Sequence, residues 1–247
     1  MSTPRAGNDL SGNHPALAPS DVQQQPPGGF GSWSAIEFLI SLLLLIVATP
    51  FLEDLSHGTL IEAILLTFML ASAVLAVSER RSTLIAAMSL ALLAITGRWL
   101  HHFRPDFSPP AIYLSTGLVL LTFVLVQYLR YILRAPIVTF TVLCAAVSTY
   151  LMVGLLWAMA YTLVASVQPE SFAFNSQPGA VMTGFNSFYF SFVTLSTVGY
   201  GDIVPISKPA RMLAAMEATT GTLYVAMLIA RLVSMYAASR SEERLRP

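Results

Sequence analysis

The sequence is poor in charged residues and in cysteine. Only 11% of its 247 residues are charged and 55% are hydrophobic, whereas soluble domains carry about 25% charged residues. The net charge of zero argues against a nucleic-acid partner. The single cysteine, Cys144, lies in an apolar run, which excludes an intrachain disulfide. No nucleophile–base pair, metal cluster or phosphate loop is present, so an enzyme and a bound cofactor are not expected. Such a chain needs lipid as its solvent.

The first 32 residues differ from the rest of the chain. They are rich in proline, glycine and glutamine and can bury little surface, so we expect residues 1–32 to be disordered. The first apolar run begins only after this segment and is long enough to span a bilayer. It is therefore read as a membrane helix rather than a cleaved leader.

Six apolar segments are predicted to cross the membrane, because about 20 apolar residues make one span. They cover residues 33–50, 59–77, 83–99, 111–133, 136–167 and 209–236. The fifth is longer than one span. Its first part is expected to lie along the membrane surface, with the true span beginning at about Val147.

Basic residues near the predicted helix ends indicate orientation. With the N-terminus inside, seven arginines fall on the cytoplasmic side and four basic residues outside. The first group is Arg80, Arg81, Arg130, Arg134, Arg240, Arg244 and Arg246, and the second is Arg98, Arg104, Lys208 and Arg211. Both termini are therefore expected in the cytoplasm.

Residues 186–196 (NSFYFSFVTLS) form an apolar run too short to span, which is typical of a re-entrant segment. They lead into residues 194–205 (TLSTVGYGDIVP), where irregular backbone is tolerated at membrane depth only if it is buried or lines a watery path. Gly199 and Gly201 allow alternate residues to take unusual dihedral angles, so that successive carbonyls point one way. Thr197 can add its hydroxyl, and several chains around an axis would complete a cage for a dehydrated cation.

Thr197-Val198-Gly199-Tyr200-Gly201-Asp202 resembles the selectivity filter of potassium channels, preceded by a pore helix. The resemblance covers about residues 139–236 well and the first four helices only in architecture. It implies a homotetramer surrounded by membrane lipid, with potassium as the permeant ion. The residues it assigns to ion binding are Thr197, Val198, Gly199, Tyr200 and Gly201.

Residues around this segment resemble the same family. Tyr189 stands where the family often has tryptophan, and its hydroxyl can donate to Asp202. Val193 resembles the voltage-gated branch, in which this position is apolar. Gly221 matches a glycine that acts as a gating hinge, although a small residue for helix packing is an equal alternative.

Glu217 lies one turn before Gly221, and an acid inside a membrane helix is a functional candidate. We expect it to support the filter through a hydrogen bond from Thr194 or Ser196 at the back of the pore helix.

One face of the last helix is predicted to line the pore, because its residues recur at helical spacing. The face consists of Thr222, Val225, Ile229 and Val233. Contact with lipid or with another helix is the alternative.

The fourth predicted helix carries basic residues only at its end, Arg130 and Arg134. Voltage sensing needs about 3–4 gating charges per subunit, so weak or no voltage dependence is expected. An ion pair between Glu62 and Arg98 is possible, with separate solvation as the alternative. His57, His101 and His102 could sense pH or bind a metal, although exposed histidines are more often simply solvated.

The sequence thus predicts an all-α membrane protein with six transmembrane helices, a re-entrant pore helix and a filter loop. Residues 33–134 form a voltage-sensor-like unit without gating charges, 135–236 the pore domain, and 237–247 a short cytoplasmic tail. The expected function is a bacterial-type potassium-selective channel of the cell (plasma or inner) membrane. A less selective cation channel and a non-conducting regulatory or scaffold subunit remain alternatives.

Overall fold

The computed structural model describes residues 32–52, 55, 57–76, 81–104, 110–135, 139–176 and 179–244. The residues before Ser32, predicted to be disordered, lie outside this description. The long helices are α1 Ser32–Leu52, α2 Gly58–Ala76, α3 Arg81–Phe103, α4 Pro110–Arg134, α5 Phe140–Val167, α6 Gly184–Leu195 and α7 Lys208–Arg244. A 3-10 turn, η1 Pro169–Ser171, and two short strands, β1 Phe172–Phe174 and β2 Ile203–Pro205, complete the described elements.

Five of the described helices are long and apolar enough to cross a membrane: α1, α3, α4, α5 and α7. In α2 the apolar stretch is shorter, from Leu60 to Val74. The helical membrane class predicted from composition is therefore confirmed, while a six-span arrangement depends on α2 crossing as well.

Two helices differ in extent from the expectation. The chain does not form a separate surface helix before Val147, because α5 runs without a break from Phe140. Its N-cap is Thr139, whose side-chain oxygen accepts a hydrogen bond from the Val142 N–H. The last helix also continues past residue 236, to Arg244.

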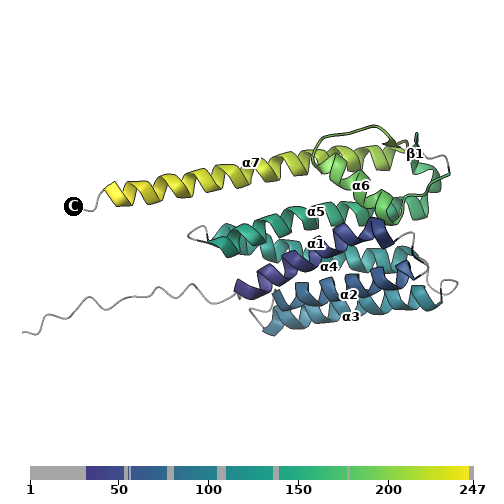
Figure 1. Ribbon diagram of the computed structural model, residues 1–247, viewed down its shortest axis with the longest axis horizontal. Helices are drawn as coiled ribbons and strands as arrows, with labels where there is room; N and C mark the ends of the chain where they lie inside the picture. The colour runs from purple at the N-terminus through teal and green to yellow at the C-terminus, as the bar shows by residue number, and fades with distance from the viewer. Residues whose placement is uncertain are drawn as a thin grey trace, which may run out of the picture.

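Helices α1 to α4 pack together into one unit, and α5 lies against it through α1 and α4 (Figure 1). The main core includes Phe38, Leu42, Leu121, Tyr128 and Met152, which are at most 1% exposed. Because α5 also contacts α6 and α7, it connects the four-helix unit to the C-terminal part of the chain.

A second, aromatic cluster lies where α6 begins and α5 ends, which we call the filter end of the bundle (Figure 1). Tyr161, Phe172 and Phe190 meet edge to face, with ring centroids 4.9 to 5.7 Å apart. Strand β1 pairs antiparallel with β2, with Phe172 opposite Pro205. This pairing anchors the chain directly after residues 197–202 to the end of α5.

Candidate functional site

The short helix α6 ends in the segment that the sequence singles out. It runs from Gly184 to Leu195, is flanked by α5 and α7, and has Ser196 as its C-cap. Residues 197–201 are neither helix nor strand and are all exposed in the single chain. We call residues 197–202 the filter segment. The predicted arrangement of a short helix followed by irregular backbone is confirmed.

Every second residue of the filter segment has a positive φ. The values are 59° at Thr197, 57° at Gly199 and 77° at Gly201. The glycines adopt this region without steric cost, whereas Thr197 carries a Cβ and is strained there. Such strain persists only where the surrounding structure enforces it, and it is concentrated at functional sites.

The filter backbone is bonded back to the end of α6. The Val198 N–H donates to the Val193 carbonyl at 2.9 Å, and the Gly199 N–H donates to the same oxygen at 3.4 Å. In a planar trans peptide the C=O points opposite to the N–H, and no cis bond occurs among the described residues. The carbonyls of Thr197 and Val198 therefore point away from α6. Val193 thus holds the filter segment through its backbone carbonyl oxygen.

Asp202 is bonded to Tyr189, as predicted. The Tyr189 hydroxyl donates to Asp202 Oδ2 at 2.7 Å, and the Ile203 N–H donates to Oδ1 at 3.0 Å. The hydrogen bond from Tyr189 is the main cause that holds the pKa of Asp202 below its ordinary value, with the Ile203 N–H acting in the same direction and burial against it. Asp202 is thereby stabilised as a carboxylate.

Asn175, which sequence reasoning missed, holds the other end of the filter segment. Its side-chain N–H donates to the Gly201 carbonyl at 2.8 Å, and its backbone N–H donates to the Asp202 carbonyl at 2.7 Å. The Gly201 carbonyl, predicted to bind an ion, is therefore bonded within the chain. Asn175 directly follows β1, and only the pairing of β1 with β2 brings it here.

The other face of the filter segment is open. Val198 is 53% exposed and Tyr200 is 71% exposed, although both side chains are large and one is aliphatic. A Cβ added at Gly199 or Gly201 would meet no atom within 4 Å. Apolar exposure next to a tightly bonded backbone is typical of a surface that contacts another protein or the membrane.

Glu217 is fully buried behind α6, but its partners are not the ones predicted. The expected partners were the hydroxyls of Thr194 and Ser196, whereas the observed ones are those of Ser191 and Tyr161, each 2.5 Å from a carboxyl oxygen. One helical turn accounts for the difference, because Ser191 lies on the buried face of α6 and Ser196 is exposed at its end. The carboxyl group joins α5, α6 and α7.

A proton on Glu217 would account for the two short contacts of the Ser191 hydroxyl. Ser191 Oγ lies 2.7 Å from the Gly154 carbonyl as well as 2.5 Å from Glu217. A hydroxyl has one hydrogen and a carbonyl can only accept. If Ser191 donates to Gly154, the contact with Glu217 is a hydrogen bond only when the carboxyl group donates. We infer that Glu217 is a neutral acid, which also avoids a buried unpaired charge.

Gly221 lies against the end of α6. A Cβ at this position would fall 2.2 Å from the Leu195 carbonyl oxygen, a backbone atom that cannot move aside easily. Close packing, one of the two readings of this glycine, therefore has a direct structural reason. The hinge role stays a prediction.

The side of α7 predicted to line the pore is exposed in the single chain. Thr222 is exposed, and the exposed fractions are 42% at Val225, 56% at Ile229 and 62% at Val233. The opposite side faces α5, where the Tyr224 hydroxyl donates to the Ala146 carbonyl at 2.7 Å. Most of α7 is exposed in the single chain, so the pore-lining role of this side stays a prediction.

Charged and titratable residues of the four-helix unit lie apart from the filter segment. The Glu62–Arg98 pair is confirmed, with 3.6 Å between Arg98 N and Glu62 O. His101 and His102 belong to the last turn of α3, where they lie beside Tyr113 and Trp99. Within the described residues, no group of three or more potential ligands could hold a metal ion.

Arg231 on α7 is a further residue that sequence reasoning missed. Its guanidinium donates to the Ala135 carbonyl, just after α4, at 2.8 Å. A cation at the carboxyl end of a helix interacts favourably with the helix dipole. The bond ties α7 directly to the four-helix unit.

The short helix α6, the irregular filter segment after it and the apolar helices are the combination expected of a membrane ion channel. Residues 137–238 match the family model described as "Ion channel". The chain is 47% identical over 49 residues to two-pore potassium channel 4 of Arabidopsis thaliana, covering 20% of this chain and 17% of that protein. It is 36% identical over 83 residues to the potassium voltage-gated channel protein shk-1 of Caenorhabditis elegans, covering 33% and 16%.

A third relative is the inward rectifier potassium channel Kirbac3.1 of Paramagnetospirillum magnetotacticum, 35% identical over 78 residues, which are 32% of this chain and 24% of that protein. The chain spans at most 24% of the length of these relatives. No solved structure is a significant match. The C-terminal part of the chain is thus similar to ion channels, and the three relatives that it matches are potassium channels.

We predict that Tyr189→Phe weakens the filter in a pH-dependent way. Because the pKa of Asp202 is lowered in the folded state, its stabilising contribution is complete above the ordinary pKa of aspartate and disappears as pH falls through the folded-state pKa. Thermal unfolding midpoints of the purified protein should therefore drop in the variant at pH 7. The gap to wild type should close in acid.

The matched control is Tyr150→Phe. The Tyr150 ring packs against the Tyr224 ring at a tilt of 37°, and no hydrogen bond of the Tyr150 hydroxyl is seen among the described residues. A Tyr189→Phe midpoint that differs from wild type equally at every pH would contradict the assigned role of Asp202.

We predict that Glu217→Gln is tolerated and Glu217→Ala is not. Glutamine can donate to Ser191 and accept from Tyr161, as the neutral acid does, whereas alanine removes the donor to Ser191 and leaves the buried Tyr161 hydroxyl without its acceptor, at about 1–3 kcal/mol. Thermal unfolding should show a midpoint near wild type for Gln and a large drop for Ala. Glu170→Gln, at an exposed position, serves as the control. Equal damage from Gln and Ala would mean that an ionised Glu217 is needed.

Proposed function

We propose that this chain is one subunit of a homotetrameric, potassium-selective channel of the cell membrane, with both termini in the cytoplasm and α2 as the sixth span. The observation that carries the proposal is the filter segment. Its φ values alternate, and its N–H groups are bonded to Val193 so that the Thr197 and Val198 carbonyls face away from α6. Carbonyl oxygens arranged in this way replace the hydration shell of a potassium ion.

Conduction makes and breaks no covalent bond and requires only carbonyl oxygens that are held in fixed positions. The residues around the filter segment hold them there. Carbonyls of Thr197, Val198, Gly199 and Tyr200 are assigned to the ion, and Asp202, Tyr189 and Asn175 hold the segment from the side. A filter segment that is held only weakly would let sodium pass as well as potassium. The two bonds at Asp202, 2.7 Å from Tyr189 and 3.0 Å from the Ile203 N–H, support a firmly held one.

The open face of the same segment supports the proposed homotetramer. One chain supplies one oxygen to each ring, so a closed cage needs several copies around an axis. The exposed sides of Val198 and Tyr200 and the exposed face of α7 are the surfaces available to those copies. In this assembly Thr222 and Ile229 line the cavity beneath the filter.

The first prediction concerns Gly199→Ala in protein reconstituted into liposomes with a potassium gradient. The φ of 57° at this position disfavours any side chain by roughly 1–2 kcal/mol, and four copies meet at the axis. Potassium flux should fall at least tenfold, and wild-type protein should pass potassium but not sodium.

Gly179→Ala provides the matched control. Gly179 also has a positive φ, 89°, with no atom within 4 Å of an added Cβ, but it lies in the loop before α6. Its flux should stay near wild type. Flux of both cations through the wild type would point to an unselective channel, and silence under all conditions to a subunit that does not conduct.

The second prediction is a shallow conductance–voltage relation. Within residues 110–134 of α4 the basic side chains are Arg130 and Arg134, both in its last two turns. Charges at the end of a span move through little of the field, so they contribute little gating charge. Recordings in planar bilayers should show open probability changing little between −100 and +100 mV, roughly the physiological range and beyond. A steep sigmoidal curve would refute the assignment.

A further inference from the structure

The carboxyl group of Glu217 belongs to a buried cluster that joins α6 to both neighbouring helices. Glu217 is fully buried, with one carboxyl oxygen 2.5 Å from the Ser191 hydroxyl and the other 2.5 Å from the Tyr161 hydroxyl. Ser191 also lies 2.7 Å from the Gly154 carbonyl of α5. One acid and two hydroxyl groups therefore meet where α5, α6 and α7 come together.

Among the described residues, the groups that face Glu217 carry no positive charge. From α5 the titratable neighbours are Tyr161 and Tyr150, and from α6 the contact is an uncharged serine hydroxyl. The titratable residue of α6, Tyr189, is bonded to Asp202 instead. Within the part of the chain that the structure describes, Glu217 forms no ion pair. A carboxylate at this place would be a buried charge without a counter-ion, which is costly.

The proton on Glu217 decides which bonds the cluster can make. With the proton, the carboxyl group donates to Ser191 and accepts from Tyr161, and Ser191 is free to donate to the Gly154 carbonyl. Raising the pH transfers the proton to hydroxide, which yields water and a carboxylate that can only accept. The single hydrogen of the Ser191 hydroxyl then has two acceptors, so either the Gly154 carbonyl or the carboxylate loses its bond.

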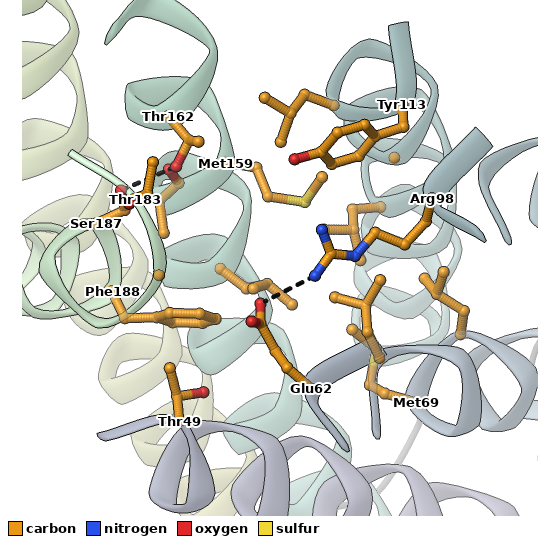
Figure 2. A pocket seen from close by; sticks show the side chains of 18 of the residues that line it. Thr49, Glu62, Met69, Arg98, Tyr113, Met159, Thr162, Thr183, Ser187 and Phe188 are labelled. Atoms are coloured by element: carbon orange, nitrogen blue, oxygen red, sulfur yellow. Dashed lines mark hydrogen bonds and ion pairs between the residues drawn. The ribbon is translucent and has the colours of Figure 1, made fainter. Parts of the chain in front are cut away.

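Three contacts, one helical turn apart, hold the same face of α6. Ser187 accepts a hydrogen bond from Thr162 of α5 at 2.8 Å (Figure 2). Ser191 is held by the Glu217 cluster one turn later, and Leu195 packs against α7 after a further turn. Of these three contacts, the middle one contains the ionisable group.

The middle contact lies next to the residue that positions the filter segment. Val193 is two residues after Ser191, and its carbonyl oxygen accepts both filter N–H groups. Packing is tight at this level, because a Cβ added at Gly154 would fall 2.8 Å from the Phe192 ring. A displacement of Ser191 relative to α5 is therefore expected to move the Val193 carbonyl as well.

Water has a route toward the cluster. A cavity of about 370 Å³ is lined by Thr162 and Ser187 and also by Thr183, which is exposed (Figure 2). The cavity thus reaches from the surface of the chain to within one turn of Ser191. Proton exchange with solvent needs such a path, because Glu217 itself has no exposed surface.

We propose that Glu217 is a positioning residue whose proton controls conduction. The protonated form keeps α6 in place and the filter segment conducting, whereas loss of the proton breaks a contact of Ser191 and lowers the potassium flux. The inference rests on the proposed function, because potassium flux is what the proton controls. Since the geometry fits the protonated form, the change is expected on raising the pH.

The first measurement is infrared spectroscopy of purified full-length protein in liposomes from about pH 6 to about pH 10, a range that covers the ionisation of buried glutamates. A carboxylic acid C=O band should be present at neutral pH and disappear in alkaline solution. Glu217→Gln should lack this band, and Glu170→Gln, at an exposed position, should keep it. If no band at neutral pH depends on Glu217, the proposal is overturned, whether or not the protein conducts.

The second measurement is potassium flux in the same liposomes, with equal pH on both sides. Wild-type flux should fall at least about fivefold from the acid to the alkaline end of the range, the lower limit of typical couplings between two sites. Glu217→Gln keeps a neutral side chain, so its flux should not vary with pH, whatever its level. Wild-type flux that ignores pH, or a Gln variant that loses flux as wild type does, would overturn the proposal.

Ser187→Ala is the matched structural control. It removes the α5–α6 hydroxyl bond one turn away but no ionisable group, so it should lower the unfolding midpoint and retain the alkaline fall in flux. If its flux no longer depends on pH, general loosening of α6 explains the effect and the role of the proton is overturned. A wild type that passes no potassium at any pH would overturn the proposed function, and with it the control of conduction, while the infrared band still reports the proton on Glu217.

Discussion

The planarity of the peptide bond is the constraint on which the rest of this structure depends. Once the N–H groups of Val198 and Gly199 bond to the Val193 oxygen, the carbonyls that precede them must face the other way. Nothing in residues 197–201 resembles a regular element, so the segment has no ladder of its own. It keeps its shape only because α6 ends at a fixed place and the following strand leaves in a fixed direction.

The neighbouring elements can be understood as supports for those two ends. Glu217 and Gly221 fix the body and the last turn of α6 against α5 and α7, the first by hydrogen bonds and the second by the close approach to the Leu195 oxygen. At the other end, β1 and Asn175 hold β2 and the last filter carbonyls. These supports come from elements that lie far apart in sequence. A substitution behind α6 is therefore expected to alter the filter segment without contacting it.

Whether a feature of the fold or the site could be predicted from the sequence depends on how far apart in sequence its interacting residues lie. The apolar runs marked the helices to within a few residues, except at the end of α7, which continues to Arg244. Tyr189 and Asp202 could be paired because a motif fixes their spacing. The partners predicted for Glu217 were wrong by one turn of α6. The sequence does not indicate which face of such a short helix is buried. Asn175 and Arg231 carried no local signal, because a strand pairing in one case and the packing of α7 near residue 135 in the other bring them to their partners. The unbroken start of α5 was missed because length alone cannot distinguish a long helix from a surface linker followed by a span.

The bond between Arg231 and Ala135 has a consequence for how the chain can be shortened. The guanidinium lies well along α7, and its acceptor belongs to the connection that leaves α4. A minimal pore made by deleting the N-terminal helices would strip a permanently charged group of its acceptor and turn it toward hydrocarbon. Such a truncation therefore needs a compensating apolar or small polar residue at position 231, and the two halves of the chain are not interchangeable modules.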